Sequence, residues 1–309
     1  MLRTILVPLD GSAMADHGLV FAMDLAKRAR ASLRLLHVRT PASAAPAKRA
    51  ATGRHAVADY LAERRARAED SGVAVTATIR DGAAVSTIMD EAHVSSADLI
   101  VLSSHGQTGP SVAWLGSVAD GVARQSDVPV LFVRARANGG AKAFEPLPIS
   151  RMLVPLDGSE QAEQVLGAAV EFARLTGAAM TLLVVDVLPV LIGEEPLEVG
   201  TRVGVAEQWR RAESYLETLA PRLRAEGVAV DVALRANQSA AAAILDEARR
   251  VGAGLIAIAT HGRSRLRRMF MGSVADKVLR GTDVPVLLVR PGNGAPAALE
   301  TRIAGQSHA

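Results

Sequence analysis

Two loop patterns of small and polar residues each occur once in either half of the chain. The first runs Leu-Asp-Gly-Ser at residues 9–12 and 156–159. The second has His-Gly at 105–106 and 261–262, followed nine residues later by Gly-Ser at 116–117 and 272–273. Glycines let a backbone approach a phosphate closely, and a helix that begins at such a loop points N–H groups at an anion. The pattern predicts a phosphate-bearing small molecule as ligand.

A structural explanation of the second loop stays open. The segments Ser117–Asp120 and Ser273–Asp276 both read Ser-Val-Ala-Asp and fit a capping box, which needs no ligand. Gly116 and Gly272 would then be turn glycines. Duplication of the whole arrangement favours binding.

Apolar runs predict the strands that position these loops. Continuous runs are typical of strands buried on both faces of a parallel sheet. They fall at 4–9, 31–38, 73–79, 98–102 and 128–133, and again at 152–156, 180–185, 228–234, 255–259 and 284–289. Helical periodicity between the runs, including helices from Ser12, from Ser117 and over 55–70, predicts right-handed βαβ units. Both loops would then lie at the carboxyl ends of strands, where such sheets bind ligands.

The length of 309 residues and the repeat predict two domains. We expect them at 1–136 and 150–292, with a linker over 137–149 and a mobile tail over 293–309. Residues 40–53 have no periodicity and are predicted to be a loop. The second half is nine residues longer, and most of the addition is expected around 189–204.

Composition restricts the chemistry. The chain has no cysteine, which excludes disulfides and thiolate sites, and no His/Glu spacing that indicates a metal centre. A net charge of +3 with two tryptophans, two tyrosines and five phenylalanines is a weak signature for nucleic-acid binding. The beginning of the chain does not resemble a secretory signal, and no apolar run approaches the length of a membrane span. A cytoplasmic location is expected.

With these motifs in view, both halves resemble universal stress protein domains, and residues 1–292 resemble a tandem universal stress protein. The resemblance rests on Val-Pro-Leu-Asp-Gly-Ser at 7–12 and 154–159, the His-Gly and Gly-Ser pairs, and Val-Pro-Val-Leu at 128–131 and 284–287. It implies an α/β fold: two open parallel five-stranded sheets of order 3-2-1-4-5, with helices on both faces, related by a pseudo-two-fold axis.

The resemblance also implies ATP, with or without Mg²⁺, as the ligand. Its glycine motif falls on Gly106, Gly116 and Ser117 in one half, and the strand-end residues around Val38 would contact adenine. The implied first-half residues are Pro8, Leu9, Asp10, Gly11, Ser12, Val38, Ser103, His105, Gly106, Gly109, Gly116, Ser117 and Val118. Those of the second half are Pro155, Leu156, Asp157, Gly158, Ser159, Val185, Ala259, His261, Gly262, Arg263, Gly272, Ser273 and Val274.

Both halves depart from the family pattern at its first glycine, which is Ser103 in one and Ala259 in the other. A small side chain is tolerated there if the glycine only provides space. If the position needs a positive φ, the replacement costs on the order of 1 kcal/mol and distorts the loop.

The loop over 263–268 holds four arginines. It could grip the phosphates of ATP or of nucleic acid, or it could be a solvated face. His105 and His261 are expected near the ligand rather than in catalysis.

The fifth strands, 128–133 and 284–289, would be apolar sheet edges, which are normally covered or paired. We expect them to meet, either within one chain as a pseudo-dimer or between chains in a homo-oligomer.

Three functional hypotheses remain. The first is an ATP-binding regulatory stress-response protein with at most slow hydrolysis, because no Walker loop and no catalytic base or arginine finger is recognisable. The second is a non-nucleotide dimerisation or interaction module of the same fold, with an unknown protein partner and no membrane partner. The third is nucleic-acid binding through 263–268.

Overall fold

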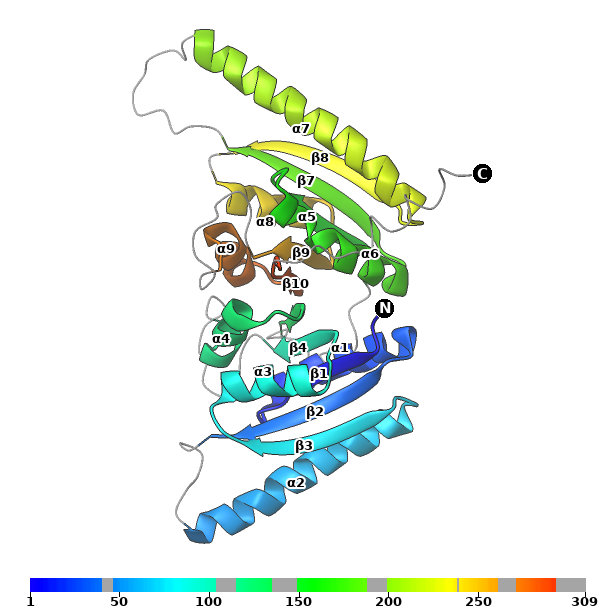
Figure 1. Cartoon of the computed structure of the whole chain (residues 1–309), viewed down its shortest axis with the longest axis vertical. Coiled ribbons are helices and arrows are strands. Elements are labelled where there is room, and N and C mark those ends of the chain that lie inside the picture. The colour runs from blue at the N-terminus through cyan, green and yellow to red at the C-terminus, as the bar shows by residue number, and fades with distance from the viewer. Residues whose placement is uncertain are drawn as a thin grey trace. The chain divides into compact units, whose positions relative to one another are not determined.

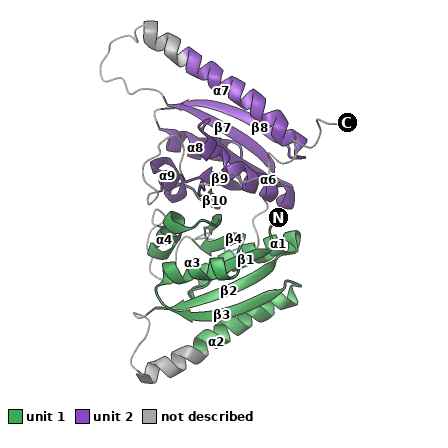
Figure 2. Ribbon diagram, in the orientation of Figure 1, with its two compact units in different colours: residues 1–148, 283–288 green, residues 149–282, 289–309 purple. Residues whose placement is uncertain are grey.

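A computed structural model describes residues 1–40, 47–103, 115–134, 149–187, 199–237, 239–260 and 271–292, and does not describe the side chains of 47–55 and 199–205. The chain divides into two compact units (Figure 2). Unit 1 contains residues 1–148 and 283–288, and unit 2 contains residues 149–282 and 289–309.

The strands of unit 1 form a sheet of order β3-β2-β1-β4-β5-β10. The strands β1 to β5 are parallel to their neighbours, and β10 is antiparallel to β5. Their bounds are β1 Thr4–Pro8, β2 Ser32–Arg39, β3 Val75–Asp81, β4 Leu99–Ser103, β5 Val130–Val133 and β10 Val286–Val289. The continuous apolar run of β1 is buried over Ile5–Val7, as expected for a strand covered on both faces.

Four helices of unit 1 follow its strands (Figure 1): α1 Ala13–Ala29, α2 Ala47–Asp70, α3 Ala84–Val94 and α4 Ser117–Gln125. Helix α1 packs against β1 and β4, and α2 packs against β2 and β3. The loop predicted over 40–53 is wrong from residue 47 onward, because α2 begins there. Alanines at 47, 50 and 51 favour helix even without an amphipathic pattern.

Unit 2 repeats this plan with four mutually parallel strands of order β9-β6-β7-β8. These are β6 Arg151–Leu156, β7 Ala179–Val187, β8 Val230–Asn237 and β9 Leu255–Ala259. Its helices are α5 Glu160–Glu163, α6 Val165–Thr176, α7 Val199–Ala225, α8 Ala240–Arg250 and α9 Ser273–Gly281.

The predicted α/β class is confirmed, but the expected count of five strands in each sheet is wrong. Strand β10 pairs with β5, and its residues 286–288 belong to unit 1. Leu287 lies opposite Leu131, and every residue of both strands is buried. The pairing covers the apolar edge that the sequence predicted for β5. The predicted linker and tail lie outside the described residues, apart from residue 149, so the predicted domain bounds stay a prediction.

Candidate functional site

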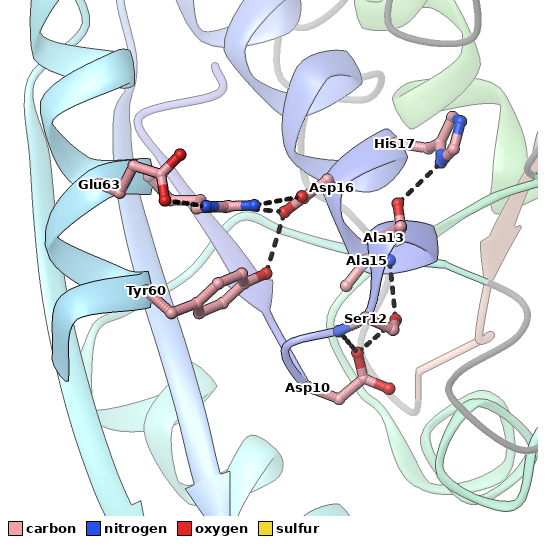
Figure 3. Close-up of polar contacts among 9 residues, drawn as sticks. Asp10, Ser12, Ala13, Ala15, Asp16, His17, Tyr60 and Glu63 are labelled. Carbon is pink, nitrogen blue, oxygen red and sulfur yellow. Dashed lines mark hydrogen bonds and ion pairs between the residues drawn. The ribbon is translucent and has the colours of Figure 1, made fainter. Parts of the chain in front are cut away.

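In unit 1 the loop after β1 is held by its own polar side chains (Figure 3). The Asp10 carboxylate accepts hydrogen bonds from the Ser12 N–H at 2.9 Å and the Ser12 hydroxyl at 2.6 Å. The Ser12 hydroxyl oxygen in turn accepts from the Ala15 N–H at 3.2 Å and caps α1, as predicted. Gly11 has a φ of 83°, which a glycine adopts without strain. Asp10 is therefore fixed at the carboxyl end of the strand.

Unit 2 has the same loop after β6. The Asp157 carboxylate accepts from the Ser159 N–H at 3.0 Å and the Ser159 hydroxyl at 2.6 Å, and Ser159 caps α5 through the Ala162 N–H at 3.2 Å. Gly158 has a φ of 76°. Pro8 and Leu9 in one unit and Pro155 and Leu156 in the other lead directly into these loops.

Glycines cap the helices that follow the second loops. Gly116 is the N-cap of α4 and Gly272 that of α9, and neither helix has a side-chain hydrogen bond at its cap. The capping-box interpretation is therefore wrong: Ser117 and Ser273 are the first helical residues, one position too late to cap. Both serines are exposed, as is Val274, while Val118 is half-buried. The first N–H groups of both helices are available to an anion.

The acidic residues of the supposed capping boxes have other partners. Asp120 binds Arg124 one turn further along α4, with 2.8 Å between carboxylate and Nε. Asp276 binds Arg280 in α9 at 3.0 Å. These i,i+4 ion pairs lie within the helices, so the two carboxylates do not cap the helix starts.

The strand end and the helix start are tied together in unit 2. The Gly272 N–H donates to the Thr260 carbonyl at 2.7 Å, which closes the base of the segment between them. Strand β4 lies beside β1, and β9 lies beside β6, so each Asp-Gly-Ser loop and each second loop leave neighbouring strands at the same edge. Two loops that leave neighbouring strands at one edge can contact the same ligand.

The departures from the family pattern are accommodated without strain. Ser103 donates a hydrogen bond from its hydroxyl to the Met14 carbonyl in α1. Ala259 is buried at the end of β9. Neither residue has a positive φ; among the described non-glycine residues only Arg30 and Ser96 do. The first position of the motif therefore does not require glycine for its backbone conformation.

Several predicted site residues lie outside the described residues: His105, Gly106 and Gly109 in the first half, and His261, Gly262 and Arg263 in the second. The arginine-rich segment 263–268 lies there as well.

The residues predicted to contact adenine end the second strand of each unit. Val38 and Val185 are both half-buried and pair with Arg80 and Arg235 in the next strand. His37 is adjacent, and its Nδ1 donates to the Leu9 carbonyl at 2.8 Å. His37 thus links the ends of β1 and β2 beside the candidate site.

Sequence reasoning also missed a polar cluster beside the first loop (Figure 3). Asp16, which is 6% exposed, accepts a hydrogen bond from the Tyr60 hydroxyl at 2.9 Å and two from Arg64 at 3.1 and 2.7 Å. The Arg64 guanidinium lies 4.3 Å from the centroid of the Tyr60 ring. Burial, followed by the charge of Asp16, raises the pKa of Tyr60. The cluster anchors α2 to the first turn of α1.

Unit 2 has a related pair at the same place. Burial, followed by the charge of Glu163, raises the pKa of Tyr215. Tyr60 and Tyr215 are the chain's two tyrosines, and Asp16 and Glu163 each lie four residues after a capping serine. That repeated placement is the sequence signal that could have revealed the cluster.

A model of the universal stress protein family matches residues 1–134 and 148–290. The chain belongs to the universal stress protein family. A universal stress protein of Mycolicibacterium smegmatis is 27% identical over 310 residues, which cover 93% of this chain and 97% of the relative. Universal stress protein YxiE of Bacillus subtilis is 30% identical over 153 residues, covering 46% of this chain and 99% of its own length.

The fold of this universal stress protein is shared by solved structures. A universal stress protein from Archaeoglobus fulgidus aligns with a TM-score of 0.68 and 21% identity, covering 94% of this chain and 97% of that chain. The resemblance to a tandem universal stress protein is confirmed by the two family matches. None of the helices in the described segments is long and apolar enough to cross a membrane.

Proposed function

We propose that this universal stress protein binds ATP at the carboxyl edge of the strands in each unit and acts as a regulatory stress-response protein. The phosphates lie at the starts of α4 and α9, beside the Asp10 and Asp157 loops. Adenine lies toward the ends of β2 and β7, near Val38 and Val185.

The glycine N-caps of α4 and α9 carry the proposal. Without a side-chain cap, the first N–H groups of each helix are bonded to no capping side chain among the described residues, and the positive end of the helix dipole lies at this start. By contrast, α1 and α5 begin with serine caps. Helix α3 also begins without a side-chain cap, at Ala83, but α4 and α9 follow the strands that lie beside β1 and β6 and therefore begin near the Asp10 and Asp157 loops.

The geometry at the first motif position supports the same proposal. Ser103 and Ala259 have ordinary backbone conformations, so the first motif position accepts a side chain in both units. The Ser103 hydroxyl is turned toward the Met14 carbonyl of α1. Backbone strain at the first motif position therefore does not oppose nucleotide binding.

Magnesium would enter with the nucleotide. Within the part of the chain that the structure describes, no group of three or more His, Asp or Glu side chains could hold a metal ion. Mg²⁺ bound to ATP is commonly held by phosphates, water and one or two carboxylates. Asp10 and Asp157 would supply the carboxylate, and the helix N–H groups would orient the phosphates.

The proposed role is regulatory because the sequence has no Walker loop and no recognisable catalytic base or arginine finger. Binding orders the loops at the strand ends, and hydrolysis is at most slow. The consequence of binding is a change in conformation or in affinity for a protein partner.

Calorimetric titration of the full chain with Mg–ATP tests the proposal. An aspartate at the first helical position repels phosphate but favours the helix, since a negative charge suits a helix N-terminus. Ser117→Asp and Ser273→Asp should each abolish or weaken one site by at least about tenfold, while the thermal unfolding midpoint stays or rises.

Ser86→Asp is the matched control, because Ser86 lies exposed in the first turn of α3, outside the Gly-Ser loops. It should leave Mg–ATP binding unchanged. Absence of heat with the unmodified chain, together with absence of nucleotide from the purified protein, would refute ATP binding and favour the interaction module.

A further inference from the structure

A cavity lies in unit 2, at the edge opposite the candidate nucleotide site. It has a volume of about 560 Å³ and is lined by Arg151, Thr181, Arg224, Asp231, Val232, Arg250 and Val251. The lining comes from the starts of β6, β7 and β8 and from the last turns of α7 and α8. In Figure 1 the strand arrowheads of β7 and β8 point away from the end at which α7 finishes. The volume is in the range of small-molecule sites.

Three arginines of this cavity are held in place by the protein. Arg151 donates to the Thr181 hydroxyl at 3.1 Å and to Asp231. Arg224 donates twice to the Val230 carbonyl, at 3.1 and 2.7 Å, and Arg250 donates twice to Glu247, at 2.8 and 2.6 Å. A guanidinium has five N–H donors, so each arginine retains donors beyond these bonds. Ordered arginines with remaining donors suit bidentate binding of phosphate.

The cavity has an excess of positive charge. Glu247, 2% exposed, is shared between Arg250 and Arg235, and its pKa is lowered, first by the hydrogen bond from Arg250. Asp231 pairs with Arg151. The bonds of Arg224 go to a neutral carbonyl instead. The residues that line the cavity thus include three arginines and one carboxylate, Asp231.

The preference of cations for the last turn of a helix does not by itself explain why arginines line this cavity. Cations are favoured near the last turn of a helix, and α7 and α8 both finish here. Unit 1 has the same helix ends, yet Glu69 takes the place of Arg224 next to the end of α2, and Val94 takes the place of Arg250 as the last residue of α3. Thr4 similarly takes the place of Arg151 at the start of the first strand. Unit 1 therefore lacks these three arginines, and its Arg34, which stands at the position of Thr181, pairs with the buried Glu91 instead.

We propose that the cavity formed by Arg151, Arg224 and Arg250 binds a small molecule carrying at least two phosphate charges. The site belongs to unit 2 only, and it is separate from the ATP sites proposed at the carboxyl edge. Its ligand is held by guanidinium groups, whereas backbone N–H groups at helix starts hold the phosphates of ATP.

Inorganic pyrophosphate is the probe, titrated calorimetrically into the full chain carrying Ser117→Asp and Ser273→Asp so that the nucleotide sites do not contribute. One site is expected. Arg224→Gln and Arg250→Gln should each weaken it at least tenfold. Arg249→Gln is the control, because Arg249 is exposed, pairs with Asp246 and lies outside the cavity; it should leave the affinity within twofold.

Val232→Glu gives a test that removes no hydrogen bond. Val232 is 48% exposed and lines the cavity, so the substitution adds a negative charge without opening the core. Pyrophosphate binding should be lost while the thermal midpoint is kept. Absence of binding by the parent chain, or binding that survives Val232→Glu and both arginine variants, would overturn the proposal.

Discussion

Ser103 shows how one side chain replaces a family glycine. Its hydroxyl donates to a helix carbonyl 89 residues earlier in the sequence, and its backbone keeps an ordinary conformation. The polar group is thus satisfied inside the protein. A hydroxyl turned toward α1 secures the strand end without occupying the loop.

We expect Ser103→Ala to lower the free energy of unfolding by about 1 kcal/mol, the usual net value of a hydrogen bond. Urea denaturation measures this change. Affinity for Mg–ATP should remain within a factor of two, because the side chain faces α1. A large loss of nucleotide affinity at unchanged stability would show instead that the hydroxyl contacts the ligand.

The tyrosines make a prediction about alkaline pH. Burial and a neighbouring carboxylate raise the pKa of both Tyr60 and Tyr215. The neutral phenols therefore contribute to the free energy of unfolding, and this contribution is fully present below the unfolded-state pKa of about 10. It is lost as the pH rises toward the folded-state pKa. In a pH titration, the tyrosinate absorbance of the folded chain should therefore appear at a higher pH than that of the chain unfolded in guanidinium.

Because the chain has two tyrosines, the absorbance reports on these two positions alone. Tyr60→Phe should halve the signal and leave the ring under Arg64. Folded protein that ionises at the same pH as the unfolded chain would contradict the placement of both phenols.

At the scale of elements, a glycine in one helix can let a neighbouring helix pack closely against it. A Cβ at Gly121 in α4 would come within 2.6 Å of a methyl group of Val85 in α3. Valine is stiff at χ1 and cannot easily turn away. In α6, a Cβ at Gly167 would meet nothing within 4 Å.

Gly121→Ala should therefore destabilise the protein by about 1–3 kcal/mol through overpacking of α3 and α4. Gly167→Ala should stabilise it by up to about 1 kcal/mol, because alanine is the better helix former. Thermal unfolding of the two variants beside the parent chain measures both signs. Equal effects of the two substitutions would argue against the close contact at Gly121.

For the molecule as a whole, the pairing of β5 with β10 joins residues far apart in sequence. Leu131 and Leu287 lie opposite each other and are 0% and 1% exposed. The strand that closes the second repeat thus completes the sheet edge of unit 1. Neither strand is left as an open apolar edge.

A double-mutant cycle of Leu131→Ala and Leu287→Ala tests this pairing in solution. Each substitution should cost about 2–5 kcal/mol, as for buried leucines. Residues in contact are coupled, so the double variant should deviate from additivity by at least about 0.5 kcal/mol. Strict additivity in the unfolding free energies would indicate that the two leucines do not meet.

The α/β class, the strand positions and the paired loops follow from the sequence alone. Continuous apolar runs, serine caps and repeated glycines are local signals, and each can be recognised within about ten residues of sequence. The prediction of a loop up to residue 53 is wrong at the start of α2 because the alanine-rich first turns of this helix lack an amphipathic pattern.

Tertiary structure decided the rest, because the remaining interactions join residues that only packing brings together. It placed the Tyr60 hydroxyl on Asp16 and turned the Ser103 hydroxyl toward Met14. It made glycine, rather than serine, the cap of α4 and α9. It also gathered Arg151, Arg224 and Arg250 around one cavity. The periodicity of the sequence does not indicate such contacts. The residues involved lie tens of positions apart, and they meet only when the strands and helices pack together.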